Sequence, residues 1–181
     1  MRVMIIPGHN ESKKGCKNDL ITTENMYEFD VVYQICATIL KLEQSRKIDL
    51  VLKKRDTYTG LAEEINWWAP DIAIEVHLNA FNKTVQGSEV LYCAASKKGK
   101  ILAAILQESF TAHLQLTDRG IKPVRRGERA DGVLWDTDMP TIIVEPFFLD
   151  SVRSKAELKA NVILAASAIL DGIEKFRRRG Q

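Results

Sequence analysis

The sequence predicts an α/β fold, in which one domain holds a mainly parallel, twisted sheet flanked by helices. Short apolar runs alternate along the chain with longer segments whose apolar residues recur at helical spacing. The length of 181 residues suits one sizeable core. No linker, repeat or low-complexity segment divides the chain. We therefore expect residues 1–181 to form a single domain.

The first quarter of the chain predicts a strand, a loop and a helix. Residues 3–6 are an apolar run ended by a proline and a glycine, which is typical of a buried strand. A polar loop should extend from Asn10 to about Thr22, and either Thr22 or Thr23 can cap the next helix. The apolar residues of that helix share one face, which should pack on the sheet. They are Val31, Ile35, Ile39 and Leu42.

The middle of the chain predicts three strands and a short helix. Residues 48–52 indicate a strand, and residues 61–68 indicate a helix that ends before Pro70. Residues 72–76 and 87–93 indicate two further strands.

The last part of the chain predicts two long helices around one more strand. Residues 98–114 and 158–176 carry apolar residues at helical spacing. Residues 122–136 have little periodicity and many charges, so we expect a loop there. Residues 141–144 indicate a strand that leads into Glu145.

Composition argues against several classes of protein. A net charge of +2 gives little reason to expect a nucleic-acid partner. No run approaches the roughly 20 apolar residues that a membrane span needs, and no targeting segment is visible, so we expect synthesis in the cytoplasm without membrane insertion. Three cysteines do not suggest a disulfide framework. Cys36 and Cys93 indicate core residues, whereas Cys16 lies in the polar loop near His9, where a ligand or thiol role is the less favoured interpretation.

Polar side chains follow the predicted strands. His9 follows the first strand, His77 and Asn79 follow a central strand, and Glu145 follows the last. Because the carboxyl ends of strands in open α/β sheets line the ligand crevice, we expect these side chains to lie close together. His113, the third histidine, lies within a predicted helix and is interpreted as structural.

Two imidazoles at such strand ends indicate a metal site. Neutral imidazole is a good zinc ligand, and catalytic zinc sites keep three protein ligands and one open position. A carboxylate is a common third ligand. The sequence therefore predicts a Zn²⁺ site at the C-terminal strand ends, with His9 and His77 among its ligands.

Three segments resemble the zinc-dependent N-acetylmuramoyl-L-alanine amidases of the family called amidase type three. Residues 5–10 (IIPGHN) resemble its opening strand and Gly-His turn, and residues 72–80 (IAIEVHLNA) resemble its Ser-x-His-x-Asn segment. Residues 139–148 (MPTIIVEPFF) resemble the third segment, and Arg119-Gly120 resembles an Arg-Gly segment. The resemblance spans almost the whole chain in the right order. Glu75 departs from the usual serine, and Asn10 departs from a common glycine.

The resemblance implies a glutamate ligand in the first turns of the first helix. Glu24 and Glu28 are four residues apart and share one helix face. Glu28 fits the family pattern and the spacing to Arg55 better, whereas Glu24 lies nearer the expected cap. We therefore predict that Glu28, with His9 and His77, binds zinc, and we keep Glu24 as the alternative.

The resemblance also implies a reaction, namely hydrolysis of the amide between N-acetylmuramic acid and L-alanine of the peptidoglycan stem peptide. Zinc would polarise the carbonyl and activate water. Glu145 would act as general base, with a fourth ligand or a salt-bridged strand end as the alternative. Asn79 would bind substrate or orient a ligand, and a structural turn is equally favoured. The alternatives in function are a zinc peptidase acting on wall peptides and a non-catalytic wall-binding relative.

The surroundings of this site are less determined by the sequence. The basic segment 119–129 could meet stem-peptide carboxylates, although a solvated loop is favoured. Trp67, Trp68 and Trp135 could stack on sugars, but we expect packing for the adjacent pair. We expect residues 1–181 to be one catalytic domain without a dedicated wall-binding domain. A chain of this kind resembles an endolysin, which reaches the cell wall after release from the cytoplasm.

Overall fold

The computed structural model describes residues 1–21, 26–43, 48–55 and 60–179. Thr22, Thr23 and Glu24 lie outside the described residues, so the predicted cap and the alternative carboxylate ligand have no structural account here. The predicted α/β class with a mainly parallel sheet is confirmed.

One six-stranded sheet organises the fold, in the order β4-β1-β5-β8-β6-β7. Four neighbouring strands are parallel: β4 (Asp49–Leu52), β1 (Arg2–Pro7), β5 (Ile72–Val76) and β8 (Thr141–Glu145). Strand β6 (Ser88–Cys93) is antiparallel to β8, and β7 (Asp118–Val124) is parallel to β6 at the edge. The carboxyl ends of β4, β1, β5 and β8 therefore share one side of the sheet.

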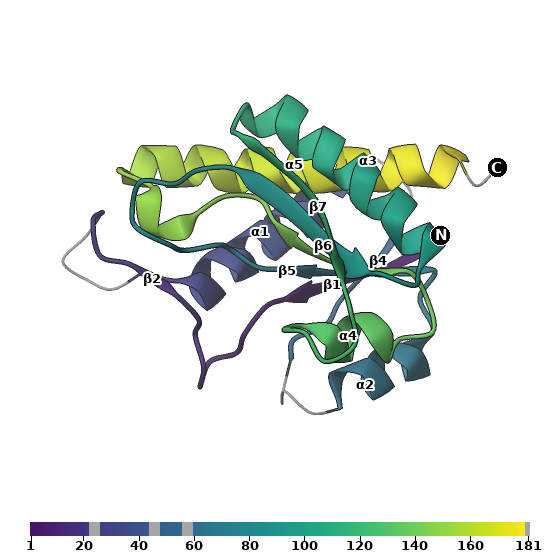
Figure 1. Cartoon of the computed structure of the whole chain (residues 1–181). Helices are drawn as coiled ribbons and strands as arrows, with labels where there is room; N and C mark the ends of the chain where they lie inside the picture. Colours follow the sequence, from purple (N-terminus) through teal and green to yellow (C-terminus); the bar gives the residue numbers. More distant parts are fainter. Residues whose placement is uncertain (22–25, 44–47, 56–59, 180–181) are drawn as a thin grey trace.

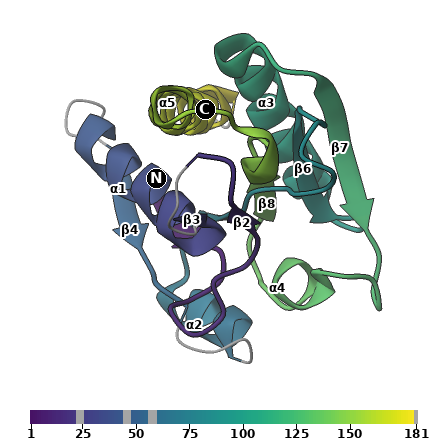
Figure 2. The same ribbon diagram turned by 90° about the vertical axis from the view of Figure 1, so that its left-hand side faces the viewer.

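Helices cover both faces of the sheet (Figure 1). One face carries α1 (Glu28–Glu43), α3 (Lys97–Leu114) and α5 (Lys155–Arg179), with α5 packed against both α1 and α3. The other face carries the shorter helices α2 (Leu61–Trp68) and α4 (Asp131–Trp135). Figure 2 shows the sheet between these two layers. None of the helices in the described part of the chain is long and apolar enough to cross a membrane.

Strand β1 shows why its sequence is apolar from Val3 onward, after the exposed Arg2. Val3 and Ile5 belong to the core under α1, α3 and α5, whereas Met4 and Ile6 belong to the second core under α2 and α4. Because successive side chains of a strand point to opposite faces, a strand covered on both sides buries every residue. Local signals set helix ends as well: Ser96 caps α3 by accepting a hydrogen bond from the Gly99 amide at 2.9 Å.

Two predicted loops contain short elements, and these predictions were wrong. Residues 122–136 hold the end of β7, whose exposed edge position removes the apolar signal, and α4, whose five residues are too few for a helical period. The loop after His9 contains β2 (Lys17–Asn18), which pairs with β3 (Met26–Tyr27), so α1 begins only at Glu28. Leu42 is 40% exposed rather than packed on the sheet.

Candidate metal centre

The predicted site residues meet where β1, β5 and β8 end. His9 lies two residues beyond β1, His77 directly follows β5, and Glu145 is the last residue of β8. Backbone hydrogen bonds continue the ladder past the strands: the amide of Gly8 donates to Val76 at 2.8 Å, and that of His77 donates to Val144 at 2.9 Å. Figure 2 looks onto this end of the sheet, where α1 begins.

Three side chains here could hold a metal ion: His9, Glu28 and His77. One ligand atom from each lies within 4.8 Å of the other two. The Glu28 carboxylate lies between the imidazoles, with Oε2 at 3.0 Å from Nε2 of His9 and Oε1 at 3.0 Å from Nδ1 of His77. The two rings are edge-to-face, with centroids 4.9 Å apart. Two imidazoles and a carboxylate are a donor set that zinc commonly takes in catalytic sites.

Backbone amides fix the Glu28 carboxylate in this position. The amide of Cys16 donates to Oε2 at 3.1 Å, and the amide of Leu78 donates to Oε1 at 3.0 Å. The loop also contacts the start of α1, because the Glu28 amide donates to the Cys16 carbonyl at 2.8 Å. The first residue of the helix is thus buried, at 3% exposure, and directed at both histidines. Cys16 contributes its backbone to the site, and its thiol lies 3.7 Å from the Leu78 carbonyl.

Two glycines leave the space that the imidazoles occupy. A Cβ atom on Gly8 would lie 2.4 Å from the His77 ring. A Cβ atom on Gly15 would lie 2.4 Å from Oε2 of Glu28 and 2.5 Å from the His9 ring. His9 itself has a φ of 64°, a backbone conformation uncommon for residues other than glycine. Such conformations cluster at functional sites, where the surrounding structure maintains them.

The charges of the cluster depend on one another. Burial alone would raise the pKa of Glu28, but hydrogen bonds and charge from His77 and His9 hold it well below its ordinary value. Burial alone would lower the pKa of His77, but the charge of Glu75 and the close approach of the Glu28 and Glu75 carboxylates raise it to about 10. The site therefore favours positive charge, and a divalent cation bound there would replace the proton on the coordinating nitrogen of His77.

Glu145 lines a cavity of about 330 Å³ together with His9, Glu28, His77 and Asn79. Its Oε2 atom is buried and has no hydrogen-bond partner among the described residues. Burial raises the pKa of Glu145 to about 8, with further contributions from Glu28 and Glu89 that His77 and Arg129 oppose. A carboxylate with a raised pKa beside a potential metal site is typical of a residue that exchanges protons.

Asn79 lies on the wall of the same cavity, where its side-chain nitrogen and its backbone form hydrogen bonds. Its Nδ2 atom donates to Glu89 at 2.9 Å, and its backbone bonds with Phe147 and Leu149 beyond β8. The structural role that the sequence left open for Asn79 therefore has contacts to support it. The substrate-binding role stays a prediction.

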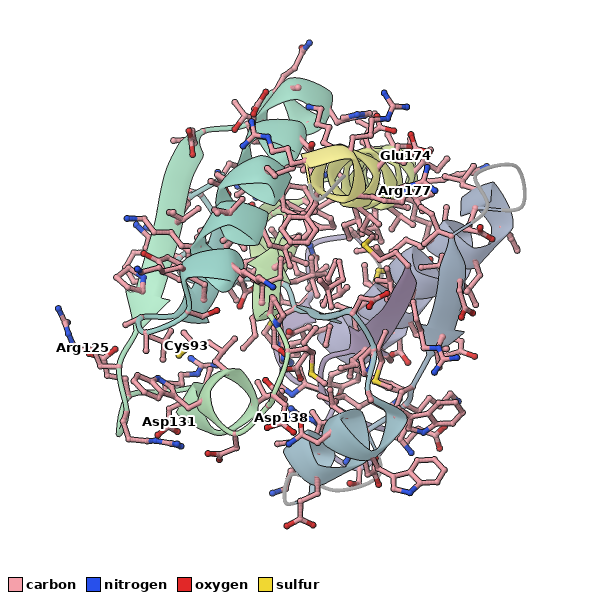
Figure 3. The ribbon with its side chains drawn as sticks, turned by 90° about the vertical axis from the view of Figure 1, so that its right-hand side faces the viewer. Cys93, Arg125, Asp131, Asp138, Glu174 and Arg177 are labelled. Carbon is pink, nitrogen blue, oxygen red and sulfur yellow. The ribbon has the colours of Figure 1, made fainter. Side chains whose placement is uncertain are left out.

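In the basic segment 119–129, three arginines form ion pairs and a fourth lies beside the site. Arg119 pairs with Glu89, Arg125 with Glu128 and Arg126 with Asp136. Figure 3 shows Arg125 pointing away from the molecule. Arg129 makes no ion pair with any described residue, and it lines both the cavity of Glu145 and a second cavity of about 520 Å³ next to it.

Other residues singled out in the sequence lie elsewhere. His113 joins α3 to α5 through Asp171 at 2.7 Å and is absent from the described metal-ligating cluster. Trp67 is 80% exposed and Trp68 41% exposed, so the expected packing of this pair was wrong. Trp135 is partly buried and donates from Nε1 to the Val124 carbonyl at 2.9 Å.

Sequence reasoning missed a buried pair behind His77. Arg55 Nη2 lies 2.7 Å from Oε1 of Glu75, and the same oxygen lies 3.1 Å from Nε2 of His77. The available signal was a single charged residue inside the otherwise apolar strand β5. Burial alone would raise the pKa of Glu75, but the charges of His77 and Arg55 lower it below its ordinary value.

Comparisons with known proteins give the same family as the sequence motifs. A family profile described as N-acetylmuramoyl-L-alanine amidase matches residues 3–175. An uncharacterized cell wall amidase of Bacillus anthracis is 27% identical over 94% of this chain, which spans about a third (34%) of that relative's length.

Solved structures of similar fold cover nearly the whole chain. An N-acetylmuramoyl-L-alanine amidase from Clostridium difficile 630 has a TM-score of 0.80 and 28% identity, over 98% of this chain and 96% of its own. The catalytic domain of the amidase CwlV from Bacillus (Paenibacillus) polymyxa var. colistinus has a TM-score of 0.79 and 22% identity, over 98% of this chain and 99% of its own.

Proposed function

Since the chain belongs to the N-acetylmuramoyl-L-alanine amidase family, we propose that it hydrolyses the amide between N-acetylmuramic acid and L-alanine in peptidoglycan with zinc-activated water. The observation that carries this proposal is the His9–Glu28–His77 cluster with Glu145 lining the same cavity. The family indicates the substrate class, and the side chains offer a chemistry that suits it.

The residues fit a zinc ion by the chemistry of their donors. His9, Glu28 and His77 offer three ligands in one cluster, and the orphaned Oε2 of Glu145 lies on the wall of the adjoining cavity. Zinc at these ligands would polarise the scissile carbonyl and lower the pKa of water toward about 7. Glu28 is the favoured carboxylate because it approaches both imidazoles at 3.0 Å.

Glu145 is assigned the proton transfers of the reaction. As a carboxylate it removes a proton from the attacking water, and as an acid it returns a proton to the leaving amine of L-alanine. Its raised pKa makes it a stronger base than an exposed glutamate, and positive charge at the ligand cluster would favour its ionised form.

Arg129 is assigned to the substrate. The stem peptide of the proposed substrate carries carboxylates, and a guanidinium beside the cavity offers paired donors to such a group. Among the basic residues of segment 119–129, Arg129 borders both cavities at the ligand cluster. We expect the cell wall to be the site of action.

The test replaces Glu145 with Gln and measures zinc content and wall lysis separately. Glu145→Gln should retain about one zinc per chain and lose at least about 100-fold in the release of wall fragments, because only the proton carrier is removed. His9→Ala and His77→Ala should lose the zinc itself. The matched control is His113→Ala, which removes the one histidine outside the cluster and should keep both zinc and activity.

Analysis of the products separates the amidase from a peptidase or a wall-binding protein. An amidase releases stem peptides that are intact and carry a free amino terminus on L-alanine. Cleavage within the stem would instead identify a zinc peptidase. Wild-type protein that holds zinc and binds wall but releases nothing would overturn the catalytic assignment.

A further inference from the structure

Glu75 is a buried carboxylate in the centre of the sheet. It is the one charged residue of β5, and it is 1% exposed. Its neighbours Ile74 and Val76 pack into the core under α1, α3 and α5. Because side chains alternate along a strand, Glu75 points to the opposite face, where the cavity of about 520 Å³ is lined by Glu75, Arg55, His9 and His77.

The positive charge of Arg55 offsets the cost of burying the Glu75 carboxylate. Its guanidinium is only 9% exposed and lies 2.7 Å from Oε1 of Glu75. A buried charge is costly unless a partner of opposite charge and good geometry accompanies it. Arg55 lies beyond the carboxyl end of β4, and only β1 separates β4 from β5. The sheet order therefore brings Arg55 to the same end of the sheet as Glu75 and His77.

The two nitrogens of His77 have different partners. Nδ1 lies 3.0 Å from Glu28, on the side of the ligand cluster, whereas Nε2 lies 3.1 Å from Glu75. An imidazole that keeps its proton on Nε2, beside a carboxylate, presents the lone pair of Nδ1 to a metal. Such an outer carboxylate fixes the ring orientation and makes the imidazole a stronger ligand.

We propose that Glu75, held by Arg55, is a positioning residue that makes Nδ1 the metal-binding atom of His77 and strengthens metal binding at the site. The inference rests on the proposed function, since it takes His77 as a metal ligand. It concerns a departure from the family pattern, because Glu75 stands where the segment that residues 72–80 resemble usually has serine.

The first measurement is zinc affinity, determined by competition with a chromophoric chelator. Glu75→Gln keeps the size of the side chain but removes its charge, so zinc affinity should fall about 10- to 100-fold. Arg55→Lys keeps the positive charge but loses the planar guanidinium, and its affinity should lie between those of wild type and Glu75→Gln.

A matched control removes a similar carboxylate that touches no ligand. Glu89 also pairs with an arginine, at 3.0 Å from Arg119, and neighbours Glu145 rather than the imidazoles. Glu89→Gln should keep zinc affinity within about threefold of wild type. Circular dichroism establishes for each variant that the folded protein is being compared.

The second measurement reads the His77 ring directly. Long-range ¹H–¹⁵N spectra distinguish Nδ1 from Nε2, and the chain has only three histidines to assign. In the zinc-loaded wild type, His77 should carry its proton on Nε2 and the metal on Nδ1. Zinc on Nε2, or equal affinity in wild type and Glu75→Gln, would overturn the role of Glu75 while leaving the zinc amidase intact. Wild type that binds no zinc would overturn both.

Discussion

Gly15 shows how strongly one residue can constrain the candidate metal centre. It has a φ of +75°, and a Cβ atom at this position would collide with both Glu28 and His9. The loop that carries Gly15 also supplies the Cys16 amide to the carboxylate. The absence of a side chain is thus required twice, for the backbone conformation and for the space beside two candidate ligands.

Gly15→Ala should therefore weaken zinc binding by at least about tenfold. The matched control is Gly127→Ala, which has a φ of +88° but open space where the Cβ would go. Both variants should lose roughly 1 kcal/mol of folding stability from the left-handed backbone. Zinc titration separates them, since only the clash at Gly15 displaces ligands. Equal zinc affinity in the two variants would contradict the close approach at Gly15.

For single residues, the sequence predicted the candidate ligands and the candidate base, but it did not predict the groups that hold those side chains in place. His9, His77 and Glu145 follow strands, so their placement followed from the rule that parallel strand ends meet. The partners of Glu28 at Cys16 and Leu78 are backbone amides, which no residue identity encodes. Glu75 and Arg55 meet only because β4, β1 and β5 are neighbours, which is a property of the sheet order.

At the scale of elements, a buried asparagine ties the loop after β1 to the segment after β8. Asn18 is fully buried, and its Nδ2 atom donates to the carbonyls of Leu149 and Val152 at 2.6 and 2.9 Å. Its Oδ1 atom accepts from the amides of Leu20 and Ile21. Leu149 begins the short 3₁₀ helix η1 (Leu149–Ser151), so Asn18 joins the two segments that flank the site.

Asn18→Ala should destabilise the protein by about 2–4 kcal/mol, because it leaves buried carbonyls and amides without partners. Asn82 is the control, since its Oδ1 accepts from Thr84 and Val85 in the same local pattern on the exposed surface. Asn82→Ala should cost only about 0.5–1.5 kcal/mol. Urea unfolding measures both values, and similar losses would show that the bond between segments contributes little.

Elements with a strong periodic signal were predictable, and exposed or very short ones were not. Helix α2 and strand β5 have the predicted bounds, because each has a clear apolar pattern and α2 precedes a proline. Strand β7 buries little, and β2 and β3 have two residues each, so they depend on pairing partners rather than on local pattern.

For the whole molecule, the ligand cluster joins segments far apart in the chain. His9 follows β1, Glu28 is the first residue of α1, and His77 follows β5. Because only the folded chain brings these three side chains together, an ion bound to all three would bind the native state and not the unfolded chain. A ligand that binds only the native state stabilises it by about 2.7 kcal/mol at 100 times its Kd.

Zinc at that concentration should therefore raise the melting temperature by about 5–10 °C for a chain of this size. His113→Ala should respond as wild type does, since the His113–Asp171 pair is outside the cluster. His9→Ala should show little response. Calorimetry with and without a chelator makes the comparison, and an equal rise in all three proteins would indicate zinc binding elsewhere.

The edge strand β7 has a consequence for how copies of this protein meet in solution. An exposed strand edge offers unpaired backbone groups on which another chain can add a strand and begin aggregation. Strand β7 carries Arg119, Lys122 and Pro123, and its pairing with β6 is irregular between Ser88 and Val90. Proline has no backbone N–H to donate, and like charges repel a second copy. The charged residues and the proline that leave β7 without an apolar pattern thus also disfavour the addition of a strand from a second copy to this edge of the sheet.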